Sequence, residues 1–358
     1  MIKALVVDDS ALMRRAISTM LLEAGDFEVE TARNGEDALA AIPRLDPDVV
    51  TLDINMPVMD GLSCLAVIMR DFPRPVVMVS SLTEAAALAT LEALELGAVD
   101  YVAKPGGTVS LNIAETQQEL VTKVRRAAGV RARPGGLASR LRREREESRA
   151  TRVTRPDRAG PSRVRTTRAD TELVLVGSST GGPALLSDLL TQLPRSFPAP
   201  VVVAQHMPAS FTATLARRLN EQCALQVSEI TAMAPIRPGH IYIAKGGNDL
   251  LLCLRGGDLT ARPAPASGEH AWHPSVDRLV ASALTIVDPA RTIGVLLTGM
   301  GNDGAEQMAQ LRRRGGRTIA ESEQSAVVWG MPGELVARRG ATVVLDAADV
   351  VPQLLSWV

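Results

Sequence analysis

Short apolar runs alternate with longer mixed segments along the first third of the chain. Runs such as VVTLD (49–53) and VVMVSS (76–81) have the length and β-branched content of buried strands. Five strand–helix repeats predict a parallel sheet with helices on both faces. The predicted strands are 5–9, 27–32, 49–53, 76–81 and 100–104, and the predicted helices are 10–24, 35–42, 61–71, 84–96 and about 113–128.

The same alternation returns in the second half of the chain. Two apolar runs within residues 241–254 flank Gly246, Gly247 and Asn248, and this pattern predicts a β-hairpin. We therefore expect a doubly wound, mostly parallel α/β domain that carries a β-hairpin. Its predicted parallel strands are 173–177, 201–206, 225–230, 292–299, 317–322 and 342–345.

A stretch between the two halves has a different composition. Residues 126–170 are rich in Arg and poor in long apolar side chains, so they cannot bury enough surface to offset their ordering entropy. We interpret them as a flexible linker, with a short helix around 137–149. The expected domains are therefore 1–125 and 171–358. The arginines could contact nucleic acid or anionic lipid, but acids are mixed among them and no aromatics are interleaved, which favours a solvated tether.

Composition and charge narrow the function further. The formal net charge is −1 in 358 residues, so the whole chain offers no argument for a nucleic-acid partner. Three widely spaced cysteines show neither a disulfide framework nor a metal motif. No apolar run reaches the roughly 18 residues of a membrane span, and the N-terminus does not read as a signal peptide. We expect a cytoplasmic protein without membrane insertion.

Charged and hydroxyl side chains gather at the predicted strand ends of the first half. Asp8 and Asp9 follow the first strand, Asp53 ends the third, Ser80 ends the fourth and Lys104 ends the fifth. Ligands of parallel sheets collect at these carboxyl ends. Clustered carboxylates suit a hard cation such as Mg²⁺, and a lysine-paired Asp can attack a phosphoryl group. Alternatively, the two N-terminal acids cap the following helix, and Lys104 forms a structural ion pair.

The segments VVDDS, TLDINMPVMDG, MVSS and VAKP resemble response-regulator receiver domains over residues 1 to about 125. The resemblance implies a flavodoxin-like (βα)5 fold, phosphorylation of Asp53 by a chemotaxis histidine kinase, and Mg²⁺ as cofactor. It implies that Asp8, Asp9, Asp53 and the backbone carbonyl of Asn55 bind the metal. The implied switch residues are Ser80, Tyr101 and Lys104.

The segment LVLVGSSTGGP (173–183) places two serines in a glycine-rich turn after an apolar run. It lacks the Lys of a phosphate-binding P-loop and the G-x-G-x-x-G spacing of dinucleotide sites. Glycines around a strand-to-helix turn also suit an exposed nucleophile, although the segment differs from the usual G-x-S-x-G elbow by one residue. The local sequence alone does not decide between these two functions.

A serine nucleophile needs a base, and the base needs an orienting acid. His206 ends one predicted strand of the second half, and Asp303 follows another in LLTGMGNDG. Their alternative roles are a structural histidine and a helix cap. Three such groups at strand ends of one sheet favour a Ser–His–Asp triad. Met300 and Gly301 would then offer free N–H groups to an oxyanion.

The segments GSSTGG, QHMP, PSVD, LTGMGNDGA and SAVVWGMPG resemble the catalytic domain of chemotaxis protein-glutamate methylesterases, the CheB family, over residues 171 to 358. The resemblance implies Ser179 as nucleophile, His206 as general base and Asp303 as its orienter. The implied oxyanion and supporting residues are Met300, Gly301 and Thr180. No cofactor is expected for the ester hydrolysis.

This second resemblance also implies an activity. The chain is expected to hydrolyse glutamate γ-methyl esters on methyl-accepting chemoreceptors under phosphorylation control, releasing methanol, and to deamidate receptor glutamines. Its expected role is sensory adaptation in chemotaxis or a related chemosensory pathway. Two alternatives are a non-enzymatic response regulator and a general esterase for small molecules.

Three stretches depart from the family pattern. AKGGNDL (244–250) lacks the family's His after the paired glycines, and His273 stands where Arg normally precedes PSVD. SEITAMAPI (228–236) strays from the acidic and glycine-containing pattern expected after its strand. All three are expected around the mouth of the site, where they would affect recognition of the receptor.

Overall fold

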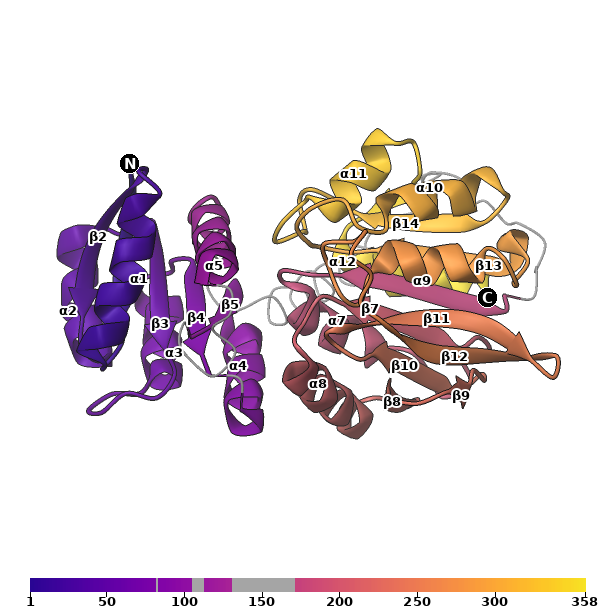
Figure 1. The fold of residues 1–358 in the computed structure, drawn as a ribbon, viewed down its shortest axis with the longest axis horizontal. Coiled ribbons are helices and arrows are strands. Elements are labelled where there is room, and N and C mark those ends of the chain that lie inside the picture. The colour runs from indigo at the N-terminus through magenta and orange to yellow at the C-terminus, as the bar shows by residue number, and fades with distance from the viewer. Residues whose placement is uncertain (82, 105–112, 131–170) are drawn as a thin grey trace, which may run out of the picture. The chain divides into compact units, whose positions relative to one another are not determined.

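The computed structural model describes residues 1–81, 83–104, 113–130 and 171–358, which belong to two compact units (Figure 1). Most of the predicted linker, including the helix expected at 137–149, lies outside these residues. The predicted domain boundaries, 1–125 and 171–358 around a linker at 126–170, stay predictions. Among the described residues, no helix combines the length and the apolarity needed to cross a bilayer.

The N-terminal unit is a five-stranded parallel sheet in the order β2-β1-β3-β4-β5. Helices α1 and α5 lie together on one face, and α2, α3 and α4 pack in sequence on the other (Figure 1). This confirms the predicted (βα)5 fold. The strands are β1 (Ile2–Val7), β2 (Phe27–Ala32), β3 (Val49–Asp53), β4 (Val76–Ser80) and β5 (Asp100–Ala103). The helices are α1 (Ala11–Glu23), α2 (Gly35–Leu45), α3 (Gly61–Asp71), α4 (Glu84–Leu96) and α5 (Ile113–Ala128).

Local sequence accounts for most of these helix boundaries. Ser10, Asp60 and Thr83 each precede a helix and accept a backbone N–H from its first turn, as N-cap residues do. The predicted end of α2 at residue 42 was too early. The helix continues through Pro43 and ends before Asp46, which has left-handed backbone geometry.

The C-terminal unit is built on a seven-stranded sheet in the order β15-β14-β13-β6-β7-β10-β8, whose strand pairs are all parallel. Helices α7, α8 and α12 pack together, as do α9, α10 and α11. The strands of this sheet are β6 (Leu173–Ser178), β7 (Val201–Gln205), β8 (Gln226–Ile230), β10 (His240–Ala244), β13 (Thr292–Leu296), β14 (Arg317–Glu321) and β15 (Val343–Leu345). The helices are α7 (Gly182–Leu190), α8 (Ala209–Gln222), α9 (Val276–Ala283), the short 3₁₀ helix η1 (Pro289–Arg291), α10 (Ala305–Arg313), α11 (Met331–Ala337) and α12 (Ala347–Trp357).

The predicted hairpin within residues 241–254 is wrong in its pairing. Strand β10 runs parallel to β7 and β8, whereas β11 (Asn248–Arg255) pairs antiparallel with β12 (Asp258–Pro265) in a separate sheet with β9 (Ala234–Pro235). The hairpin turns at Gly256 and Gly257, both with positive φ, as a two-residue type I′ turn requires. Gly246 has a different role, because a Cβ there would lie 2.1 Å from the carbonyl oxygen of Met207.

The strand order changes direction at β6, which has β7 on one side and β13 on the other. Ligands of open α/β sheets bind at such switch points, beyond the carboxyl ends of the strands. Aliphatic side chains of β6 and β7 form a core with α9, including Leu175, Val202, Val276 and Leu279, which are all fully buried. The loops after β6, β7 and β13 therefore start from a rigid base.

Candidate functional site

The pairing of β6 with β7 brings Ser179 and His206 together. Ser178 and Gln205 are the last paired residues of the two strands, and each candidate is the next residue along. The His206 amide donates to the Ser178 carbonyl at 3.0 Å. On the other side, the Ser179 amide donates at 3.0 Å to the carbonyl of Thr298, which follows β13. Ser179 is thus fixed between its two neighbouring strand ends.

The two serines of the turn have different surroundings. Ser178 is fully buried, and its hydroxyl donates to Gln205 Oε1 at 2.6 Å. Ser179 is partly exposed, and Gln205 Nε2 donates to its carbonyl at 2.9 Å. Ser178 is therefore a structural hydroxyl, whereas Ser179 can be reached by a substrate.

Two glycines allow this close packing of the turn. A Cβ at Gly182 would lie 2.2 Å from Gln205 Oε1, and a Cβ at Gly299 would lie 2.8 Å from the Ser179 Cβ. Both distances are too short for a side chain to fit without displacing the serine or the glutamine. The glycines of the two loops thus leave room for the side chains of Gln205 and Ser179.

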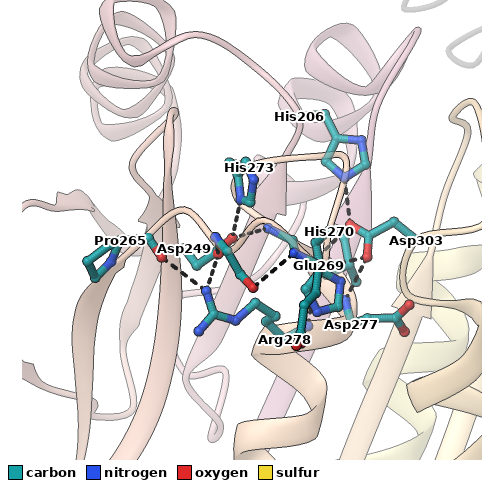
Figure 2. Close-up of polar contacts among 12 residues, drawn as sticks. His206, Asp249, Pro265, Glu269, His270, His273, Asp277, Arg278 and Asp303 are labelled. Atoms are coloured by element: carbon teal, nitrogen blue, oxygen red, sulfur yellow. Dashed lines mark hydrogen bonds and ion pairs between the residues drawn. The ribbon is translucent and has the colours of Figure 1, made fainter.

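His206 is paired with Asp303, from the loop after β13. His206 Nε2 lies 2.8 Å from Asp303 Oδ2, and both side chains are almost fully buried (Figure 2). His206 Nδ1 is also buried and makes no hydrogen bond within the described residues. The indole of Trp272 stacks on the imidazole, with ring centroids 5.4 Å apart and an interplanar angle of 10°. Nδ1 is therefore the ring nitrogen that can accept a proton.

Asp303 is held mainly by the start of helix α9. Its carboxylate accepts the Val276 amide at 2.7 Å, the Asp277 amide at 2.9 Å and the Ser275 hydroxyl at 3.0 Å. Burial alone would raise its pKa, but the hydrogen bond from His206 and these backbone donors outweigh burial and lower the pKa of Asp303. The carboxylate stays ionised and can stabilise a cationic imidazole.

The predicted oxyanion and supporting residues lie beside the serine turn. Gly301 has a φ of 85°, and among the described residues the amides of Met300 and Gly301 donate to no other group. Thr180 is joined to the same loop, because the Thr298 hydroxyl donates to its carbonyl at 2.9 Å. These free amides can receive a developing oxyanion. In the described part of the chain, however, no hydrogen bond joins the Ser179 hydroxyl to His206; such bonds commonly tighten only with substrate.

The N-terminal unit has an acidic site at the carboxyl edge of its sheet. Lys104 Nζ lies 3.0 Å from Asp8 Oδ2 and 2.8 Å from Asp53 Oδ2, and both aspartates are buried. Carboxylate oxygens of Asp8, Asp9 and Asp53 lie within 4.8 Å of one another. An all-oxygen set of this kind fits Mg²⁺. The capping alternative fails in part, since Ser10 itself caps α1.

Burial and the ion pair act in opposite directions on Asp53. Burial raises its pKa, and the pairing with Lys104 only partly offsets this effect, while Asp8 adds to it. For Lys104, burial lowers the pKa, but the bonds to Asp53 and Asp8 outweigh burial and the pKa rises. The lysine therefore remains charged beside the predicted phosphoacceptor.

The predicted switch residues lie near this edge. Ser80 is buried, and its hydroxyl oxygen accepts a hydrogen bond from the Thr90 hydroxyl at 2.9 Å. The Lys104 amide donates to the Ser80 carbonyl at 2.8 Å. Tyr101 is buried under the Lys123 ammonium, which lies 4.9 Å from its ring centroid. Asn55 is exposed in the loop after β3. The structure thus places all the predicted receiver residues at or near one sheet edge.

Three residues at the esterase-like site were not predicted as functional. Gln205 supports the serine turn, Ser275 bonds Asp303, and Trp272 covers His206. Gln205 directly precedes His206, and Ser275 belongs to PSVD just before a helix, so their positions carried a usable signal. Trp272 carried none, because its loop has no regular structure.

Comparisons with known proteins agree with this geometry. Residues 174–354 match the CheB methylesterase family, and residues 4–114 match the response regulator receiver domain family. A Rhodospirillum rubrum protein named protein-glutamate methylesterase/protein-glutamine glutaminase 3 is 55% identical over 360 residues, covering 100% of this chain and 96% of that protein. A Rhodopseudomonas palustris protein, named protein-glutamate methylesterase/protein-glutamine glutaminase 2, is 49% identical over 359 residues, covering 100% and 98%.

A solved structure matches the C-terminal unit. The crystal structure of the Thermotoga maritima CheB methylesterase catalytic domain superposes with a TM-score of 0.51 at 37% identity, covering 53% of this chain and 100% of that one. The two family matches account for both units, in the order expected from the sequence motifs. The chain therefore belongs to the CheB methylesterase family and carries a response regulator receiver domain at its N-terminal end.

Proposed function

We propose that this chain hydrolyses glutamate γ-methyl esters on the cytoplasmic part of chemoreceptors and releases methanol. The same acyl chemistry converts receptor glutamine to glutamate and releases ammonia. The family membership supports the reaction, and one observation carries the assignment of residues. A buried His206–Asp303 pair lies beside Ser179 at the switch point of the sheet, with one imidazole nitrogen free.

In the proposed reaction, the Ser179 Oγ attacks the ester carbonyl carbon while its proton passes to His206 Nδ1. An ionised Asp303 holds the other imidazole proton on Nε2, which leaves Nδ1 as the acceptor. The amides of Met300 and Gly301 receive the oxyanion. Methanol leaves with the proton from Nδ1, and the acyl-serine remains.

In the second half of the reaction, a water molecule gives a proton to His206 Nδ1 and attacks the acyl carbon. The acyl–oxygen bond to Ser179 breaks, the serine regains its proton, and the receptor carboxylate is released. No cofactor takes part in these steps as proposed.

The acidic site is proposed to regulate this reaction. Asp53 accepts a phosphoryl group from a histidine kinase, Lys104 pairs with the group, and Asp8, Asp9, Asp53 and the Asn55 carbonyl hold Mg²⁺. When bound, Mg²⁺ neutralises charge on the phosphoryl oxygens. Phosphorylation favours a state with altered Ser80 and Tyr101, and this shift of population raises esterase activity.

The test is methanol release from methylated chemoreceptor membranes by the parent chain and by Ser179→Ala. We expect release by the parent and loss of about 10³-fold or more in the variant, as in other serine hydrolases. Equal release by both proteins would rule out Ser179 as nucleophile. Activity on short acyl esters without activity on receptor membranes would favour a general esterase.

A further inference from the structure

A second buried carboxylate lies behind the proposed active site, at the start of β11. The Asp249 side chain is fully buried, and its Oδ1 accepts the Ser275 amide at 2.8 Å and His273 Nδ1 at 3.0 Å. Its Oδ2 pairs with the Arg278 guanidinium and accepts the Ser267 amide at 3.3 Å (Figure 2). One carboxylate thus joins both ends of residues 267–275 to the β11–β12 sheet.

Asp249 is ionised under ordinary conditions. Burial would raise its pKa, but hydrogen bonds from His273, Ser275 and Arg278 outweigh burial and hold the pKa below its usual value. A buried ionised carboxylate with four donors is costly to rearrange, because each lost donor leaves unsolvated charge. The contacts of Asp249 therefore hold their geometry firmly.

The segment 267–275 contacts the proposed active site at two points. Trp272 stacks on His206, and the Ser275 hydroxyl donates to Asp303 at 3.0 Å. The segment contains neither helix nor strand, so no backbone ladder fixes its course. The segment is instead held by side chains such as Asp249 and by a main-chain hydrogen bond, from the Gly247 amide to the His273 carbonyl at 3.2 Å.

Asp249 and His273 lie in two of the stretches where the sequence departs from the family pattern, AKGGNDL and the residue before PSVD. The structure places them in direct contact, although 24 residues separate them along the chain. In this chain each residue thus satisfies a polar group of the other.

We propose that Asp249, together with His273, is a positioning residue for the proposed esterase reaction. The pair holds residues 267–275 so that Trp272 lies flat on His206 and Ser275 bonds Asp303. The imidazole then keeps one orientation, with Nε2 on Asp303 and Nδ1 left without a hydrogen bond among the described residues. This inference rests on the proposed function for its catalytic consequence, but the stacking of Trp272 can be tested without any substrate.

The first measurement uses fluorescence. The chain has three tryptophans, so the emission of Trp272 must be isolated. It is obtained by subtracting the emission of a full-length chain that carries Trp272→Phe from the emission of the same chain with Trp272. A protonated imidazole quenches an indole stacked on it, so Trp272 emission should fall on acidification in the parent. We expect this pH-dependent quenching to disappear in Asp249→Asn. Unchanged quenching in that variant would overturn the proposal.

The second measurement separates kcat from KM in methanol release. We expect Asp249→Asn to lower kcat about 10- to 100-fold through misplacement of His206, with KM changed by less than about threefold. A rise in KM with unchanged kcat would overturn the proposal in favour of a role in receptor binding. The control is Asp258→Asn, an exposed acid on the same hairpin, which should behave as the parent in both measurements.

A second pair of variants keeps the test decisive if Asp249→Asn does not fold. His273→Leu removes the donor to Asp249 and should lower kcat and quenching together. His273→Gln keeps an N–H donor and should restore part of both. Equal behaviour of the Leu and Gln variants would contradict the proposal. If the parent itself released no methanol, the proposed function would fail, whereas the quenching would still report on the pair.

Discussion

His206 Nε2 lies 2.8 Å from Asp303 Oδ2, although 97 residues separate the two in sequence. Neither residue could reach the other without the strand order β13-β6-β7, which brings the loops after these strands to one edge. The same order puts Ser179 between them. The proposed triad is therefore a consequence of sheet topology, and perturbations of single side chains should affect it in distinguishable ways.

Ser178→Ala should lower stability but spare the reaction. The substitution leaves Gln205 Oε1 without the hydroxyl that donates to it, and a buried unsatisfied acceptor costs about 1–3 kcal/mol. Thermal unfolding and methanol release would be measured on the same preparations. A loss of activity as severe as that of Ser179→Ala, in a folded protein, would show that the two serine roles have been exchanged.

Asp303→Asn should lower kcat by about 10⁴-fold, the effect seen when a triad acid is neutralised in other serine hydrolases. It should also destabilise the C-terminal unit by about 1–3 kcal/mol at neutral pH, because three donors lose a charged acceptor. Kinetics of methanol release and urea unfolding at pH 7 check both effects.

The stability effect of Asp303 should depend on pH. Since its pKa is lower in the folded than in the unfolded chain, its contribution is present above the unfolded value of about 3.9 and is lost as pH falls through the folded value. The difference in unfolding free energy between parent and Asp303→Asn should therefore shrink in acid. A difference that grew on acidification would mean that the folded carboxyl is protonated more easily than the unfolded one.

Asp53→Asn should abolish the response to a small phosphodonor. The predicted result for the parent is a higher rate of methanol release with phosphodonor and Mg²⁺, and no increase after chelation of the metal by EDTA. The variant should show no increase under either condition. Asp71→Asn changes an exposed acid of the same unit and should respond as the parent does. An equal increase in Asp53→Asn would contradict its assignment as phosphoacceptor.

Gly246→Ala should destabilise the C-terminal unit by about 1–3 kcal/mol or more, as overpacking does. The new Cβ would lie 2.1 Å from the Met207 carbonyl and 2.6 Å from the Ala209 amide, in the loop that follows His206. The matched control is Gly268→Ala, whose Cβ would meet no atom within 4 Å. Equal melting temperatures of the two variants would show that the loop moves aside at no cost.

The sequence predicted the strand and helix pattern well because both units are built from short, buried parallel strands. Several elements, such as β3 and α3, have the predicted bounds. The hairpin was misplaced because Gly246-Gly247 and Gly256-Gly257 are both plausible turns and lie close together in sequence. Strand β12 was not predicted because it contains Pro263 and Pro265, which are more typical of loops than of strands. Only the structure shows that residue 246 must be glycine because the Met207 carbonyl lies too close for a side chain to fit.

The grouping of Ser179, His206 and Asp303 was predictable because the first two directly follow strands β6 and β7 and the third lies in the loop after β13. It was not predictable where side chains reach across elements. The contact of Asp249 with His273 and the stacking of Trp272 on His206 depend on an irregular segment, for which neither periodicity nor spacing gives a signal.

Asp303 takes two of its hydrogen bonds from main-chain amides at the start of α9, which no side-chain substitution can remove. Substitutions in α9 should therefore leave these two bonds to Asp303 in place, provided that the helix still starts at the same residue. Asp249 shares this protection in part, because two of its four donors are the main-chain amides of Ser267 and Ser275. The donors that a substitution can remove are the side chains of His273 and Arg278.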